Sequence, residues 1–236
     1  MLDRVAQTDF IIAPPPAASI AVYGETKRFP VRRIFCVGRN YAAHAREMGK
    51  DPDREPPFFF TKPADAVVDN GATIPYPRES KNVHYEIELT VAIGREGVDI
   101  PVEQALDYVW GYGVGIDLTR RDLQSQAKDM GRPWDWGKAF DRSAPCAPLY
   151  PVAQTGHPTK GRIWLAVNGE TKQDGDLAEL IWPVADIISI LSRSMEIKPG
   201  DLIMTGTPAG VGPVVPGDRM TGGVDGLGEI AITLAR

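Results

Sequence analysis

The stretch from His84 to Gly94 constrains the fold more than any other part of this chain, because it reads as an apolar β-strand that carries two carboxylates. Glu86 and Glu88 stand at positions i and i+2, so both side chains point to one face of such a strand. An exposed acidic face is one interpretation. If the strand is interior, the two acids must be paired, protonated or bound to a metal. All-oxygen ligation favours Mg²⁺, Mn²⁺ or Ca²⁺ over zinc.

A third acid follows the next predicted strand. Residues 110–116 form a glycine-rich strand pattern that ends at Asp117, and Thr119 is placed to cap a helix over residues 120–130 that stops at Gly131. Asp117 therefore stands at a strand end, where ligands are commonly presented. Two interpretations stay open for it: a metal ligand beside the two glutamates, or part of the helix cap.

His44 and Glu47 form a second group with chemical potential. The sequence predicts a short helix over residues 41–48, capped by Asn40 and closed by Gly49. Spaced i and i+3, the two side chains share one face, so the carboxylate can orient the imidazole while its other nitrogen acts on a water molecule. The alternative is a purely structural histidine on an alanine-rich helix.

Composition bounds the class of protein. The chain has 236 residues, 43% of them hydrophobic, and a net charge of −5, which fits one core and lacks the basic balance of a nucleic-acid or anionic-membrane binder. No apolar run approaches the length of a membrane span, and the first residues lack the pattern of a secretory signal, so we expect a cytoplasmic protein. Cys36 and Cys146 are too few for a disulfide framework and are expected as reduced core thiols.

The element pattern is that of an α+β, mostly β, protein with short helices. Strands are predicted at 33–38, 57–60, 67–68 and 229–234, a hairpin at Asn168-Gly169, and a helix after Pro183. Residues 1–30 are interpreted as an N-terminal arm or edge strand, and residues 31–236 as one domain, which the resemblance described below implies to be catalytic. The glycine patterns at 111–116 and 206–212 match neither a dinucleotide fingerprint nor a phosphate-binding loop.

Taken together, several motifs resemble the fumarylacetoacetate hydrolase superfamily. They are Gly38 to His44, Lys62-Pro63, Tyr85 to Leu89, Gly113 to Asp122, Gly137 to Asp141, Pro199-Gly200-Asp201 and Thr205 to Gly212. The resemblance runs in the family's order from about residue 31 to the end. The opening half is similar in particular to the bacterial fumarylpyruvate hydrolase subfamily.

The resemblance implies a fold, a metal and roles for named residues. The fold would be a mixed β-sandwich roll around a divalent cation, Mg²⁺ or Mn²⁺, with Ca²⁺ able to replace it in isolated protein. Its ligands would be Glu86, Glu88 and Asp117. The roles implied for other residues are a His44–Glu47 dyad in a lid helix, an oxyanion-stabilising Lys138, and substrate contacts from Arg39, Arg121, Gln124 and Thr207. The family also implies a homodimer.

The activity implied is hydrolysis of a carbon-carbon bond in a small 2,4-dioxo acid, an acylpyruvate. Fumarylpyruvate would give fumarate and pyruvate, as in gentisate breakdown. Decarboxylation of oxaloacetate or isomerisation of a dienoate on the same metal site are alternatives that need no water nucleophile. A non-catalytic binding protein on the same fold is the remaining alternative, and the intact acids and dyad argue against it.

Overall fold

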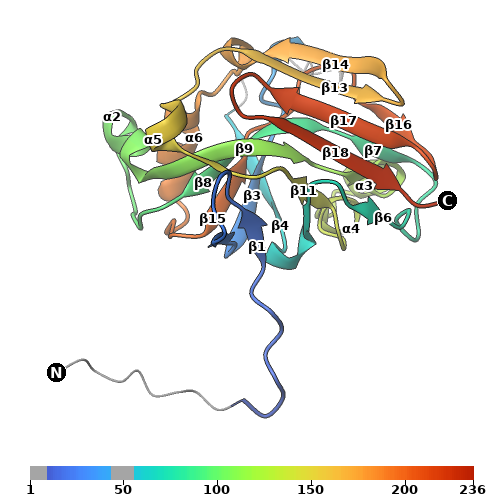
Figure 1. The fold of residues 1–236 in the computed structure, drawn as a ribbon, viewed down its shortest axis with the longest axis horizontal. Coiled ribbons are helices and arrows are strands. Elements are labelled where there is room, and N and C mark those ends of the chain that lie inside the picture. Colours follow the sequence, from blue (N-terminus) through green and yellow to red (C-terminus); the bar gives the residue numbers. More distant parts are fainter. Residues whose placement is uncertain (1–9, 44–55) are drawn as a thin grey trace.

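The computed structural model describes residues 10–43 and 56–236, and their chain is built mostly from β-strands arranged in sheets that curl around one another (Figure 1). This confirms the predicted fold class. Within the described residues no helix is long and apolar enough to cross a membrane.

The central element is an eight-stranded mixed sheet with the order β4-β3-β15-β8-β9-β11-β5, in which β12 also pairs with β9. Its strands are β3 (Arg33–Gly38), β4 (Phe58–Lys62), β5 (Val67–Asp69), β8 (Ile87–Ile93), β9 (Val109–Ile116), β11 (Ala144–Cys146), β12 (Tyr150–Pro151) and β15 (Asp201–Met204). The contact between β8 and β9 is antiparallel, and it aligns Glu88 with Gly115.

Strand β8 is buried along its whole length, so both faces of the central sheet are covered. Its odd-numbered residues, such as Leu89 and Val91, belong to the larger hydrophobic core. Ala92, on the opposite face, belongs to a second core with Cys36 and Met204. Glu88 shares that second face by the alternation of the strand. A carboxylate there has no access to bulk water along the strand, and its charge must be compensated inside the protein.

A five-stranded sheet covers one side of the molecule, in the order β14-β13-β17-β18-β6 (Figure 1). Its strands are β6 (Thr73–Ile74), β13 (Arg162–Val167), β14 (Glu170–Asp176), β17 (Arg219–Val224) and β18 (Glu229–Leu234). The predicted hairpin joins β13 to β14. Asn168 and Gly169 both have positive φ, at 52° and 85°, as a two-residue hairpin turn requires.

Two small sheets complete the fold. One is β1 (Ser19–Ala21) with β2 (Arg28–Pro30), and the other has the order β10-β7-β16, from β7 (Val83–Tyr85), β10 (Thr119–Arg120) and β16 (Gly212–Val214). Ile20 and Phe29 of the first pack into the second core. Residues 10–17, before β1, run away from the body of the molecule (Figure 1).

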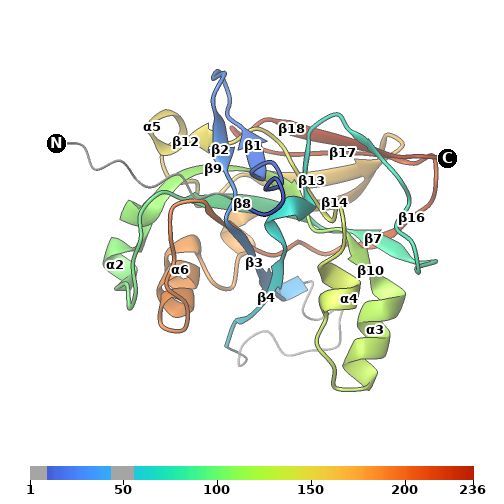
Figure 2. The ribbon, with the colours of Figure 1, turned by 90° about the horizontal axis from the view of Figure 1, so that it is seen from below.

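The helices are short, as expected. They are α2 (Val102–Ala105), α3 (Arg121–Asp129), α4 (Asp135–Lys138), α5 (Val152–Thr155) and α6 (Val184–Ser192), with 3₁₀ turns η1 (Ala64–Ala66), η2 (Leu106–Tyr108) and η3 (Leu177–Glu179). Helices α3 and α4 lie side by side on the same side of the sheets (Figure 2). Gly137 of α4 permits this approach, because a Cβ there would lie 2.8 Å from the Gln124 Cβ.

One local prediction is wrong. Thr119 does not cap α3: it lies in β10, and its hydroxyl donates to the Asp117 carbonyl, 3.2 Å away. The helix begins after Arg120, which makes no side-chain cap. The pairing of β10 with β7 keeps Thr119 in extended structure, so the sheet overrides the capping preference of this residue.

Candidate active site and metal centre

The three predicted acids meet in the interior. Glu86 lies at the break between β7 and β8, Glu88 lies within β8, and Asp117 follows β9. Their exposed fractions are 6%, 2% and 0%. One carboxylate oxygen of each lies within 4.8 Å of the others. The interpretation of Glu86 and Glu88 as an exposed acidic face is therefore wrong.

Two lysines and an arginine contact these acids. Lys138 Nζ lies 2.8 Å from Glu86 Oε2 and 2.6 Å from Asp117 Oδ2. Arg121 pairs with the other oxygen of Glu86, and Lys62 Nζ lies 2.8 Å from Asp117 Oδ1. Asp117 thus points into the acid cluster, and its interpretation as a part of the helix cap is wrong.

The compensation of the acids is incomplete. Lys62 is close enough to Asp117 Oδ1 for an ion pair but outside hydrogen-bonding geometry, so this buried oxygen has no hydrogen-bond donor among the described residues. Glu88 accepts one backbone hydrogen bond, from Gly206 at 2.8 Å. Burial raises the pKa of Glu88 well above its usual value, and Asp117 and Glu86 add to the rise.

These features fit a divalent cation. The donor set is all carboxylate oxygen, which suits Mg²⁺ and Mn²⁺. Such an ion would bind the Asp117 oxygen that lacks a hydrogen bond and would stabilise the ionised form of Glu88, which burial disfavours. The glycine at 206 is part of the arrangement: its φ is +98°, and a Cβ there would lie 2.7 Å from the Cβ of Asn40. A larger residue would displace the backbone amide that binds Glu88.

Lys138 is held where two acids share its charge. It ends α4 and is 2% exposed. Burial alone lowers the pKa of Lys138, but Asp117 and Glu86 together outweigh burial and the pKa is raised. The ammonium is therefore a fixed positive donor at the acid cluster, suited to stabilise negative charge on a reacting group.

Lys62 is a site residue to which sequence reasoning assigned no role. It ends β4, is 2% exposed, and donates to the carbonyls of Leu118, at 3.1 Å, and Lys138. It therefore ties the segment after Asp117 to the end of α4. The sequence signal was the Lys62-Pro63 motif, whose lysine ends an apolar aromatic strand.

Arg121 is positioned by neighbours on both sides. Its Nη1 donates to Gln124 Oε1 at 2.7 Å, and its Nε lies 3.4 Å from His84 Nδ1. Burial, followed by the charge of Arg121, lowers the pKa of His84 to about 4. A neutral His84 can accept from Arg121 while its Nε2 contacts Asn82 Oδ1 at 2.9 Å. The imidazole is thus placed to orient a guanidinium rather than to transfer protons.

The remaining predicted substrate residues line a small inner cavity of about 30 Å³, together with Glu86 and Glu88. Arg39, Arg121, Gln124 and Thr207 all border it. Thr207 is fixed by Gln173, whose amide donates to the threonine hydroxyl at 2.8 Å. The structure therefore brings the predicted metal-ligating and substrate-contacting residues to one place.

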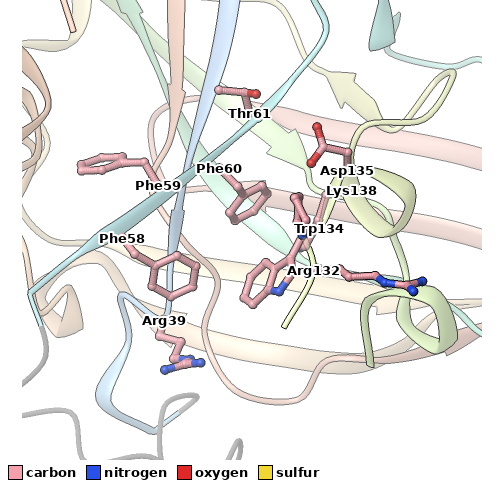
Figure 3. Close-up of a pocket in the computed structure, with 10 residues that line it drawn as sticks. Arg39, Phe58, Phe59, Phe60, Thr61, Arg132, Trp134, Asp135 and Lys138 are labelled. Carbon is pink, nitrogen blue, oxygen red and sulfur yellow. The ribbon is translucent and has the colours of Figure 1, made fainter. Parts of the chain in front are cut away.

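A larger outer chamber of about 540 Å³ opens beside the inner cavity (Figure 3). Phe58 and Phe60 lie on one face of β4 and flank Trp134, with ring centroids 5.1 and 5.7 Å away, while Phe59 points to the other face. Arg39 and Arg132 border the same chamber. The two cavities adjoin, because both are lined by Arg39, Phe58, Phe60, Trp134 and Lys138.

His44 and Glu47 lie outside the described residues, so the geometry of the predicted dyad is not part of this description. Asn40, near the start of the predicted helix, is described and fully buried. It donates to the Thr205 carbonyl at 2.8 Å and accepts from the Trp182 amide at 2.7 Å. The chain entering the dyad segment is therefore anchored to the loop that binds Glu88.

The sequence matches the family model described as fumarylacetoacetate (FAA) hydrolase C-terminal, over residues 33–235. The chain belongs to this family. This family membership, together with the fumarylpyruvate hydrolase relatives described below, makes the chain a metal-dependent hydrolase.

Individual relatives support the assignment. The chain is 57% identical to a fumarylpyruvate hydrolase from Pseudomonas aeruginosa, whose crystal structure contains Mn²⁺ and pyruvate, with a TM-score of 0.94 over 96% of this chain and 99% of that one. It is 46% identical to a fumarylpyruvate hydrolase of a Ralstonia species, over 79% of this chain and 98% of the relative. It is also 42% identical to a mitochondrial oxaloacetate tautomerase of Arabidopsis thaliana, over 86% and 91%.

Proposed function

We propose that this protein hydrolyses acylpyruvates, and that fumarylpyruvate is its preferred substrate. The observation that carries the proposal is the buried group of Glu86, Glu88 and Asp117, of which the two glutamates line a cavity that is also bordered by arginines and lysines. The similarity to a fumarylpyruvate hydrolase with Mn²⁺ and pyruvate bound supports both the metal and the substrate class. The predicted homodimer and cytoplasmic location stay predictions.

The three carboxylates would hold Mg²⁺ or Mn²⁺, which would supply Lewis acidity to the 2-oxo acid group of the substrate. Arg121 and Gln124, already hydrogen-bonded to each other, would orient that group, with Arg39 and Thr207 closing the cavity around it. The buried charges would act strongly on the substrate because little water screens them.

The bond-breaking step uses the remaining residues. His44, oriented by Glu47, would take a proton from the water that attacks the distal carbonyl. Lys138 would donate to the oxyanion that forms there. The carbon-carbon bond to the pyruvate methylene then breaks, the water oxygen stays on the acyl product, and a proton is returned to the methylene carbon. The products are a carboxylic acid and pyruvate.

The outer chamber supports fumarylpyruvate over uncharged acyl groups. Its volume of about 540 Å³ is within the range of small-molecule sites, and Arg132 and Arg39 offer positive charge to a second carboxylate. Phe58, Phe60 and Trp134 would pack against the flat unsaturated chain between the two ends.

The test is a comparison of substrates with Mn²⁺ or Mg²⁺ present. We expect the highest kcat/KM for fumarylpyruvate, ahead of acetylpyruvate and oxaloacetate. Replacing Arg132 by Gln should lower kcat/KM for fumarylpyruvate by about tenfold and leave acetylpyruvate nearly unchanged, because only the former presents a distal carboxylate. Arg193→Gln, an exposed arginine that borders neither cavity, is the matched control. Better turnover of acetylpyruvate would instead establish a broader acylpyruvase.

Oxaloacetate is a second candidate substrate. The observation that favours it is the 42% identity to an oxaloacetate tautomerase. Tautomerisation or decarboxylation of oxaloacetate needs no activated water, so the inner cavity and its cations would suffice. In the same comparison, a kcat/KM for oxaloacetate above that for both acylpyruvates would favour this function.

A further inference from the structure

Lys128 borders the inner cavity and has no role in the reaction described above. It lies in the last turn of α3, half-buried, with its Nζ 4.9 Å from the centre of the Trp134 ring. The cavity it borders is the one lined by Glu86, Glu88 and Gln124.

Lys128 differs from the other cations of the site in its partners. Lys62, Lys138 and Arg121 each contact a carboxylate of the acid cluster. Among residues 10–43 and 56–236, by contrast, no carboxylate lies within ion-pair distance of Lys128. Burial, followed by the charges of Arg121 and Arg39, lowers the pKa of Lys128 to about 8. A partly desolvated ammonium beside other cations is stabilised by an anion that enters from outside.

The size of the cavity indicates which part of a ligand brings that anion. The inner cavity is about 30 Å³ and the outer chamber about 540 Å³, so the longer acyl chain fits the outer chamber and not the inner cavity. The chain must lie in the outer chamber, where Arg39 and Arg132 are found. Lys128 borders the inner cavity and not the outer chamber, and it therefore faces the end of the ligand that lies at the acid cluster.

We propose that Lys128 is a substrate-binding residue whose ammonium holds the carboxylate of the 2-oxo acid end next to Glu86 and Glu88. This rests on the proposed function in one respect, that the ligand is a 2-oxo acid. The face of Trp134, which lines the same cavity, lies 4.9 Å from Lys128 Nζ and holds the ammonium at the cavity wall. Lys128 would bind the 2-oxo acid end, which all candidate substrates share, and Arg132 would bind the distal carboxylate of fumarylpyruvate.

Variants at Lys128 test the proposal with two readouts. Lys128→Gln should raise KM for fumarylpyruvate, acetylpyruvate and oxaloacetate by a similar factor of roughly 10 to 100, the size of a lost charged hydrogen bond, with kcat changed much less. Lys128→Arg should restore most of the affinity. Lys160→Gln, at an exposed lysine that borders neither cavity, is the control and should behave like the wild type.

Binding of pyruvate to the Mn²⁺-loaded protein, measured by calorimetry, separates this proposal from the proposed function. Lys128→Gln should weaken pyruvate by the same factor and leave the affinity for Mn²⁺ itself unchanged. This holds even if the wild type hydrolyses no acylpyruvate, in which case the proposed function fails alone. Three results would each overturn the role of Lys128: unchanged pyruvate binding, a KM effect confined to fumarylpyruvate, or a matching loss of Mn²⁺ affinity.

Discussion

Two buried aspartates of the central sheet differ in how completely their charge is compensated. Asp201 begins β15 and is 0% exposed. Its carboxylate accepts hydrogen bonds from Arg32 at 2.9 and 3.0 Å, from Arg33 at 3.4 Å and from the Lys198 amide at 2.8 Å. Asp117 is equally buried, yet it stands beside two further carboxylates and keeps an oxygen without a hydrogen-bond donor.

The difference separates a structural acid from a functional one. Asp201 joins β3, β15 and the preceding turn through donors that the chain itself provides, so it needs nothing else. The Asp117 cluster leaves one buried carboxylate oxygen without a hydrogen bond and gives Glu88 a single backbone donor, which costs stability that a bound cation would restore. Incomplete compensation, rather than burial, is the feature that marks the site.

The largest effect should come from removing the metal ion or one of its carboxylate ligands. Chelation should abolish turnover and Mn²⁺ should restore it. At low metal concentration Glu88→Gln should lower kcat/KM by roughly 10³-fold, because a metal ion supplies several kcal/mol to the reaction. The variant should not lower the free energy of unfolding of the metal-free protein, since it removes a poorly compensated charge. Activity and urea unfolding measure the two effects.

Asp201→Asn is the matched variant and should behave oppositely. Losing charge-assisted bonds from two arginines should lower the free energy of unfolding by about 2 to 3 kcal/mol, while the folded fraction keeps its activity and Mn²⁺ affinity. If Asp201→Asn loses Mn²⁺ binding, or Glu88→Gln unfolds the protein, the distinction between the two acids is wrong.

A second test separates the contribution of His44 to the reaction rate from that of the buried acids. Replacing His44 by Ala should lower the rate of acylpyruvate hydrolysis by roughly 10² to 10⁴, the usual contribution of a general base. Decarboxylation of oxaloacetate should fall less, because it requires no activated water, and Mn²⁺ affinity should be nearly unchanged. Equal losses in both reactions with intact metal binding would show that His44 is not the hydrolytic base.

The smallest expected effect is a difference in pH dependence. Because burial raises the pKa of Glu88 well above its ordinary value of 4.5, the folded metal-free protein holds this proton at pH values where the unfolded chain has released it. The folded state then binds more protons, so this group makes the free energy of unfolding fall as pH rises above about 4.5. Glu88→Gln should remove that contribution.

Urea unfolding of chelator-treated protein at about pH 5 and about pH 8 measures this effect as the stability of the variant relative to wild type. The relative stability of Glu88→Gln should increase with pH, whereas Glu103→Gln, at an exposed acid in α2, should show no such trend. A flat difference for Glu88→Gln would mean that its charge is compensated as fully as that of Asp201.

The strands and the acids could be predicted from the sequence, because period-2 alternation and position at a strand end are local signals. The predicted strands at 33–38 and 229–234 coincide with β3 and β18. The interruption at Glu86 could not be predicted, because it arises where β7 leaves to pair with β10 and β16 rather than with β9. The misplaced cap at Thr119 has the same origin: long-range strand pairing overrode a local preference.

The charged surroundings of the acids were the harder part. Lys62 and Lys128 come from β4 and α3, and only the folded chain brings them to Asp117 and to the inner cavity. Nothing in their local sequence separates them from ordinary surface lysines. The motif that includes Lys62 indicated an important position but not the acid that the lysine contacts. The acids themselves could be identified, because carboxylates are unusual in an apolar strand.

The outer chamber and the acid cluster come from different parts of the chain, and this matters for how such an enzyme diversifies. The walls of the outer chamber come from β4 and from the turn that carries Arg132 and Trp134, while the acid cluster comes from the ends of β7, β8 and β9. Substitutions at Thr61 or Arg132, which border the outer chamber and not the inner cavity, can therefore change the binding of the proposed acyl group without altering the acid cluster. Under the proposed function, selection can act on the acyl half of the substrate while the carboxylates that serve the 2-oxo acid half stay unchanged.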